Sequence, residues 1–201
     1  MSLSSVARLV QLGFALAAGP VLAINAGTAA PEFSVADANG KTVKLSDYKG
    51  RFVVLEWTNP ECPFVRAQYG ANAMQALQKE AGAKDVVWLA VNSTNKANRE
   101  YKTGAQISQW MKDNGAAPKA ILIDATSDTA RAYDAKTTPH MFVIDPAGKI
   151  VYAGAIDDKR SARESDRQTA NNYVRAALNE ATAGRPVSVA NTAPYGCSVK
   201  Y

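Results

Sequence analysis

The two cysteines, Cys62 and Cys197, are the residues of this 201-residue chain best suited to chemistry. Cys62 follows an apolar run and directly precedes Pro63, a residue type favoured in the first turn of a helix. The start of a helix offers unpaired N–H groups and the positive end of the helix dipole, and both stabilise a thiolate. The pattern predicts that Cys62 is a redox-active nucleophile and that Pro63 beside it helps to position substrate. An inert buried cysteine or a plain disulfide is the alternative.

Cys197 lies near the end of the chain, in a tail spanning residues 184–201. If it pairs with Cys62, the closed loop spans 135 residues (197 − 62). We favour Cys197 as a resolving thiol that attacks Cys62 after its oxidation, because a flexible tail suits a moving thiol. A fixed structural disulfide between the same two residues is the alternative.

Three further side chains, Glu56, Trp57 and His140, are candidates for a role beside the cysteines. Glu56 falls in an apolar run, where it points either into the core or outward to solvent, since side chains alternate along a strand. Trp57 is a candidate for positioning substrate, with core packing as the alternative. His140 is the only histidine, so a metal site could combine only Cys62, Cys197 and His140. We expect no metal and no other cofactor, and a histidine at the surface or at a strand edge.

The composition is that of a soluble globular protein, with 47% hydrophobic and 20% charged residues. The net charge is +5, but the basic residues are scattered, which argues against nucleic-acid binding. A single histidine also excludes zinc-finger sites.

Residues 1–23 have the pattern of a signal peptide, with Arg8 before an apolar run that ends in Val21-Leu22-Ala23. A second candidate cleavage site near Ala29 would move the cut as late as residue 30. The apolar run is too short for a membrane span, and Pro20 interrupts it. We expect an exported protein, periplasmic or secreted, with no stable membrane span after cleavage and with conditions in which a disulfide persists.

Strand and helix signals alternate after Pro31, which predicts one α/β domain with a mixed sheet over residues 30–183. A small hairpin is expected over residues 33–45. The patterns predict further strands at 52–57, 86–91, 121–123, 141–144 and 150–152, and helices at 63–81, 97–114, 127–135 and 165–183.

A predicted strand leads into Trp57-Thr-Asn-Pro-Glu-Cys62-Pro-Phe-Val65 and then a helix, and Thr137-Thr138-Pro139 later precedes another strand. This order of elements and motifs resembles the thioredoxin superfamily. The hairpin and the extra helix are similar to the redoxin branch, which holds the alkyl hydroperoxide reductase/thiol-specific antioxidant proteins and the TlpA-like disulfide reductases. The resemblance implies a thioredoxin-like fold and a cis peptide bond before Pro139. It also implies that Thr138 and Pro139 lie against the reactive sulfur and guide substrate, and that Glu56 moves protons during disulfide exchange.

The chain departs from these relatives in two ways. Val65 stands where thioredoxin-type sites carry the second cysteine of C-x-x-C. Asn59 stands where peroxiredoxins carry a threonine, and Pro139 falls where they carry an arginine. The C-P-F-V motif and the ending Gly196-Cys-Ser-Val-Lys200 are similar to those of peroxiredoxin-like redoxins.

These features predict an exported, peroxiredoxin-like thiol oxidoreductase with antioxidant peroxidase activity. Its partners would be a peroxide or a protein disulfide as substrate, and an external thiol reductant such as a thioredoxin-like protein. The first alternative is a TlpA-like thiol–disulfide reductase or isomerase of exported proteins. The second is a redox-inert binding module held by a structural disulfide.

Overall fold

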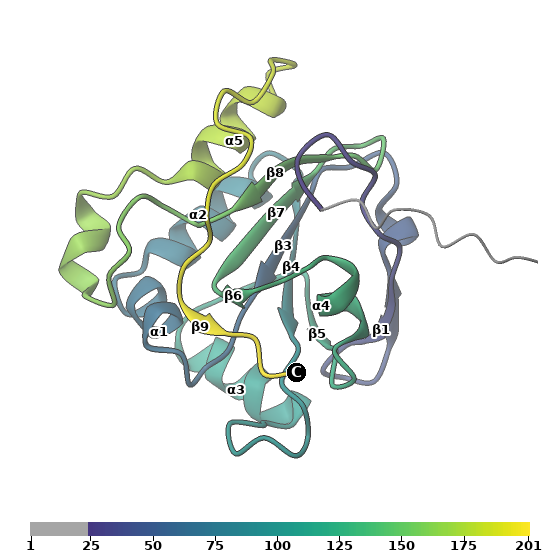
Figure 1. Cartoon of the computed structure of the whole chain (residues 1–201), viewed down its shortest axis with the longest axis vertical. Coiled ribbons are helices and arrows are strands. Elements are labelled where there is room, and N and C mark those ends of the chain that lie inside the picture. The colour runs from purple at the N-terminus through teal and green to yellow at the C-terminus, as the bar shows by residue number, and fades with distance from the viewer. Residues whose placement is uncertain (1–23) are drawn as a thin grey trace, which may run out of the picture.

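The computed structural model describes residues 24–201, and the predicted signal peptide over residues 1–23 lies outside the described residues. The described chain forms a central sheet with helices on both faces (Figure 1). Its strands are β1 (Ser34–Ala36), β2 (Thr42–Lys44), β3 (Val53–Trp57), β4 (Val87–Asn92), β5 (Ala120–Ile123), β6 (Thr137–Thr138), β7 (His140–Ile144), β8 (Ile150–Gly154) and β9 (Cys197–Ser198). Its helices are α1 (Pro63–Gly70), α2 (Ala73–Gly82), α3 (Gly104–Asp113), α4 (Asp128–Ala132) and α5 (Tyr173–Ala181), with 3₁₀ turns η1 (Leu45–Tyr48) and η2 (Glu164–Gln168).

The central sheet has the strand order β5-β4-β3-β7-β8. Strands β3, β4 and β5 are parallel, whereas β7 runs antiparallel to β3 and β8 runs antiparallel to β7. The predicted mixed sheet, thioredoxin-like element order and N-terminal hairpin of β1 and β2 are confirmed.

Strand β3 is buried along its whole length because helices and loops cover both of its faces. Val54 packs into a core with residues of α1, α2, α3 and α5. Val53 and Leu55 point the other way, into a core with α4 and the N-terminal hairpin. Successive side chains of the strand that leads to Cys62 therefore belong to two separate cores.

Two of the predicted long helices are interrupted. The helix expected over residues 63–81 is split into α1 and α2 at Asn72, whose left-handed backbone (φ 57°) cannot continue a helix. The helix expected over residues 165–183 is a 3₁₀ turn followed by α5, with an irregular link between them.

Helix α3 begins at Gly104, later than the expected residue 97. Thr103 caps it: the Thr103 side chain accepts a hydrogen bond from the Gln106 N–H, and the Gln106 side chain accepts one from the Thr103 N–H. This reciprocal cap satisfies N–H groups that the helix start leaves unpaired. None of the described helices is long and apolar enough to cross a membrane.

The tail packs on the domain instead of extending freely from it. After α5 it runs beside β8, where the Thr192 N–H donates to the Ala153 carbonyl oxygen at 3.1 Å. It then forms β9, which pairs with β6, and the Asn95 N–H donates to the Lys200 carbonyl oxygen at 2.8 Å. Figure 1 shows this path in yellow, from α5 to the end of the molecule where β6 and α1 lie.

Candidate active site

Cys62 lies at the N-terminal cap of α1, with Pro63 as the first helical residue. The Cys62 N–H donates to the Asn59 carbonyl oxygen at 3.0 Å, and the Arg66 N–H donates to the Cys62 carbonyl oxygen at 2.9 Å. Cys62 is 1% exposed. The strand-to-helix junction predicted from the sequence is therefore present, and the thiol lies under a covering layer.

Thr138 and Pro139 form part of that layer. The peptide bond between them is cis, as the resemblance implied. The Cys62 thiol donates a hydrogen bond to the Thr138 carbonyl oxygen, with Sγ and O 3.0 Å apart. Thr138 is itself buried, so the strand before Pro139 contacts the thiol directly through its backbone.

Cys197 pairs with the same residue, Thr138. Strand β9 runs antiparallel to β6, with Cys197 opposite Thr138. Partial burial raises the pKa of Cys197, and the neighbouring Cys62 thiol raises it further. Both cysteines are free thiols, and the fold brings them together across a sequence separation of 135 residues.

Gly196 allows the tail to approach this closely. A Cβ atom built on Gly196 would overlap the Thr138 carbonyl oxygen, far inside van der Waals contact. Its backbone also has φ +134°, a conformation that other residues rarely adopt. A side chain at this position would separate Cys197 from Thr138.

Glu56 points inward and is fully buried beneath α1 and α2. Its carboxyl group accepts hydrogen bonds from Trp88 Nε1 at 2.8 Å, the Tyr69 hydroxyl at 2.9 Å and Gln78 Nε2 at 3.3 Å. Burial raises the pKa of Glu56 to about 7, although these hydrogen bonds act in the opposite direction. The inward alternative for Glu56 is the one observed, and its carboxyl group ionises near neutral pH.

Trp57 faces the opposite core, which favours the core-packing alternative over a role in positioning substrate. Its indole is fully buried, packs against Tyr133 and Phe142 at centroid distances of 5.3 and 5.4 Å, and donates to Ser93 Oγ at 3.1 Å. No part of the side chain reaches the surface on which a substrate would lie. The alternation of side chains along β3 gives Glu56 and Trp57 their different surroundings.

His140 is the first residue of β7 and is buried, so of the two expected places, the surface and a strand edge, the surface is not observed. Its Nδ1 accepts a hydrogen bond from the Lys136 N–H at 3.2 Å, and its ring packs on Phe142. Burial lowers the pKa of His140 to about 4, so the ring is neutral at physiological pH. Among residues 24–201, no three acidic, histidine or cysteine side chains gather as a metal site would require.

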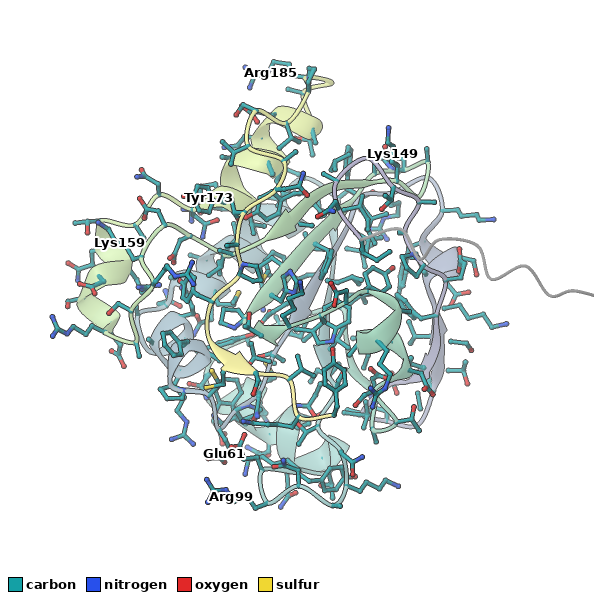
Figure 2. All side chains as sticks on the ribbon, in the orientation of Figure 1. Glu61, Arg99, Lys149, Lys159, Tyr173 and Arg185 are labelled. Carbon is teal, nitrogen blue, oxygen red and sulfur yellow. The ribbon has the colours of Figure 1, made fainter. Side chains whose placement is uncertain are left out.

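The contacts of two groups of charged residues near the thiols could not be predicted from local patterns in the sequence. Glu100 accepts a hydrogen bond from Asn59 Nδ2 at 2.8 Å and lies 3.6 Å from the Lys200 ammonium, joining the loop after β4 to the tail. Asp157 is buried in an ion pair with Arg167. Figure 2 labels Glu61 and Arg99, which mark the end of the molecule where the thiols lie.

Comparison with known proteins places the chain among thiol oxidoreductases. The AhpC/TSA family model matches residues 26–153. The thiol-disulfide oxidoreductase ResA of Bacillus subtilis is 29% identical over 128 residues, which are 64% of this chain and 66% of ResA, just under two thirds. The thioredoxin-like protein YneN of the same organism is 30% identical over 145 residues, 71% of this chain and 80% of YneN.

A crystal structure of an uncharacterised conserved protein from Geobacillus kaustophilus is also similar. It is 29% identical, with a TM-score of 0.76, and the alignment covers 89% of this chain and 93% of that protein. The similarity therefore extends past the family match, over most of the described chain.

Proposed function

Because the chain belongs to the AhpC/TSA family and is a thiol-based oxidoreductase of the thioredoxin superfamily, we propose that it exchanges disulfides, with Cys62 as nucleophile and Cys197 as resolving thiol. The observation that carries the proposal is the register of β6 and β9. Cys197 lies opposite Thr138, and the carbonyl oxygen of Thr138 accepts the hydrogen bond from the Cys62 thiol. The tail thus supplies the second thiol that Val65 does not.

The exchange proceeds in two steps. The Cys62 thiolate attacks one sulfur of a substrate disulfide, the substrate S–S bond breaks, and one substrate thiolate leaves. The Cys197 thiolate then attacks the Cys62 sulfur of the mixed disulfide and releases the second substrate thiol. The substrate is reduced by two electrons and the enzyme holds a Cys62–Cys197 disulfide, which an external thiol reductant returns to two thiols.

Glu56 supports this chemistry from inside the core. Its carboxyl group ionises near pH 7 and lies among Tyr69, Gln78 and Trp88, under the helix that begins at Cys62. A buried group of this kind can hold or release a proton as the thiols ionise and react. We assign Glu56 a positioning and proton-holding role, because its hydrogen bonds go to neighbouring side chains and not to either sulfur.

The Thr138 carbonyl oxygen contacts the Cys62 thiol, and Pro139 and Pro63 directly follow these two residues in the chain. Their place beside the thiol supports a role for all three residues in positioning substrate. A protein disulfide is the substrate class that the relatives' activity favours, since ResA is named as a thiol-disulfide oxidoreductase. Export, a periplasmic or secreted location and a thioredoxin-like reductant remain part of the proposal. The signal-like residues 1–23 and a chemistry that depends on disulfides support them.

Peroxide reduction was the leading prediction from the sequence, and disulfide exchange has the better support. ResA is named as a thiol-disulfide oxidoreductase, and Asn59 and Pro139 stand where peroxiredoxins carry a threonine and an arginine. A redox-inert binding module is disfavoured by the similarity to ResA, which is named as a thiol-disulfide oxidoreductase.

The test compares two oxidants on the purified, reduced protein. Oxidised glutathione and hydrogen peroxide are mixed separately with it, and Cys62 oxidation is followed by intact-mass spectrometry. We expect glutathione disulfide to close the Cys62–Cys197 bond, and Cys197→Ser to retain one glutathione on Cys62. A reaction with peroxide much faster than that of a free thiol, without reaction with disulfides, would reverse the assignment.

A further inference from the structure

The described part of the chain contains a buried ion pair that the exchange steps do not use. Asp157 follows β8, and Arg167 lies in η2; their side chains are 2% and 1% exposed, with Arg167 Nη1 and Asp157 Oδ2 2.8 Å apart. In Figure 2, Lys159 marks the loop between the two residues. Arg167 Nη2 donates to the carbonyl oxygens of Lys159 and Ser161, which holds this loop closed.

Two other side chains complete the group, and both come from the segments that carry the thiols. The Tyr195 hydroxyl donates to Asp157 Oδ1 at 2.6 Å and accepts from Arg167 Nη1 at 2.8 Å. Gln68 Nε2 donates to Asp157 Oδ2 at 2.7 Å. Tyr195 is two residues before Cys197 in the tail.

Gln68 belongs to α1, the helix that begins after Cys62. The group therefore joins the tail to that helix through one carboxylate, Asp157. A ring contact adds a second link: Phe64 of α1 packs edge-on against Tyr195 at a centroid distance of 5.8 Å. Between Tyr195 and Cys197 only Gly196 intervenes, so the position of Tyr195 limits where Cys197 can lie.

Stability alone does not account for a group of this kind. Removing two charges from water is unfavourable, and apolar side chains of similar volume often stabilise a fold equally well. Directional hydrogen bonds between buried groups, however, select one arrangement of the segments that they join. Intramolecular reactions depend strongly on such placement, and a displacement of about 1 Å can slow them by about a hundredfold.

Resting on the proposed function, we propose that Asp157, Arg167, Tyr195 and Gln68 are positioning residues that hold Cys197 over Cys62. They act on the second step of exchange, in which the Cys197 thiolate attacks the Cys62 sulfur and expels the second substrate thiol. The first step, attack by Cys62 on substrate, depends on α1 and Thr138 and does not need them.

The test separates the two steps with oxidised glutathione as the probe. Cys62 displaces one glutathione and retains the other, and Cys197 then displaces the retained glutathione, so that two protein thiols are oxidised and one glutathione disulfide is reduced. Rapid acid quenching and intact-mass spectrometry follow the mixed disulfide. Equilibration of the protein in mixtures of reduced and oxidised glutathione gives the effective concentration of Cys197 toward Cys62.

Tyr195→Phe removes one hydroxyl and keeps the ring on Phe64. We expect the second step and the effective concentration to fall about tenfold or more, and the first step to change less than about twofold. Gln68→Leu removes the donor from α1 and should slow the second step in the same direction. Because Gln68 lies outside the tail, it provides an independent measurement if Tyr195→Phe folds poorly.

Tyr133→Phe is the matched control, since the Tyr133 hydroxyl donates to the Pro31 carbonyl oxygen at 2.7 Å in the opposite core. We expect it to leave both steps unchanged. An unchanged second step in Tyr195→Phe and Gln68→Leu, or equal slowing in Tyr133→Phe, would overturn the positioning role alone. A wild-type protein that closes no Cys62–Cys197 disulfide would overturn the proposed function as well.

Discussion

The two faces of the central sheet are built from different kinds of side chain, although β3 contributes to both. The face under α1 and α2 holds a buried carboxyl group, Glu56, among polar partners. The face under α4 and the N-terminal hairpin holds the interlocked rings of Trp57, Tyr133 and Phe142. The first face carries a carboxyl group with a raised pKa under the helix that begins after Cys62, and the second face carries closely packed aromatic rings.

This difference explains why two adjacent residues, Glu56 and Trp57, have separate roles. Burying Glu56 is unfavourable for the fold when it is ionised, whereas burying Trp57 is favourable at every pH. Substitutions on the Glu56 face should therefore change reactivity and pH dependence, and substitutions on the Trp57 face should change stability.

The largest expected effect comes from Cys62→Ser. A serine hydroxyl does not ionise at neutral pH and cannot form the mixed disulfide, so disulfide exchange should fall by at least about a thousandfold. The free energy of unfolding, measured in urea, should change by less than about 2 kcal/mol. Retained exchange in this variant would contradict the assignment of the nucleophile.

Trp57→Ala tests the other face. We expect it to lower the free energy of unfolding by about 3–5 kcal/mol, because a fully buried indole leaves a large cavity. The exchange rate of the molecules that remain folded should stay close to that of the wild type. A large loss of exchange at full folding would instead return Trp57 to the substrate surface.

Glu56→Gln tests the pH dependence. The folded pKa of about 7 lies above the ordinary value of 4.5, so the folded state binds more protons between these values. Wild-type stability should therefore fall as the pH rises through this interval, by roughly 3 kcal/mol in total, and stay lower above it.

The amide side chain of the Glu56→Gln variant cannot ionise. Its free energy of unfolding, measured in urea at several pH values, should therefore fall less than that of the wild type over the same pH interval. The pH profile of the exchange rate should also lose its inflection near pH 7. Identical pH slopes in the two proteins would show that Glu56 titrates at its ordinary pKa.

Gly196→Ala tests the close approach of the tail to Thr138. The new Cβ would clash with the Thr138 carbonyl oxygen, so β9 should separate from β6 and closure of the Cys62–Cys197 disulfide should slow about tenfold. Gly184→Ala is the control, because Gly184 also has positive φ (+71°) but no atom within 4 Å of a Cβ built there. Equal slowing in both variants would attribute the effect to backbone strain instead of to the contact with Thr138.

Local patterns in the sequence were sufficient to predict the central part of this protein. The apolar run before Cys62, Pro63 after it and the alternation of strands with helices predicted the strand-to-helix junction and the mixed sheet. The cis bond before Pro139 came from the resemblance to the thioredoxin superfamily, and it is present. The long helices were predicted less well, since a left-handed residue such as Asn72 has no clear local signal.

The remaining features depend on contacts between residues far apart in the sequence. Whether Glu56 points inward depends on which helices cover that face of β3, and the position of Cys197 depends on pairing between β9 and β6. The buried Asp157–Arg167 pair is bonded by Gln68 and Tyr195, which lie 89 and 38 residues from Asp157 in the sequence. Short-range periodicity determined which elements form, and only the tertiary structure decided which polar groups are buried beside the thiols, because burial depends on all the segments that meet there.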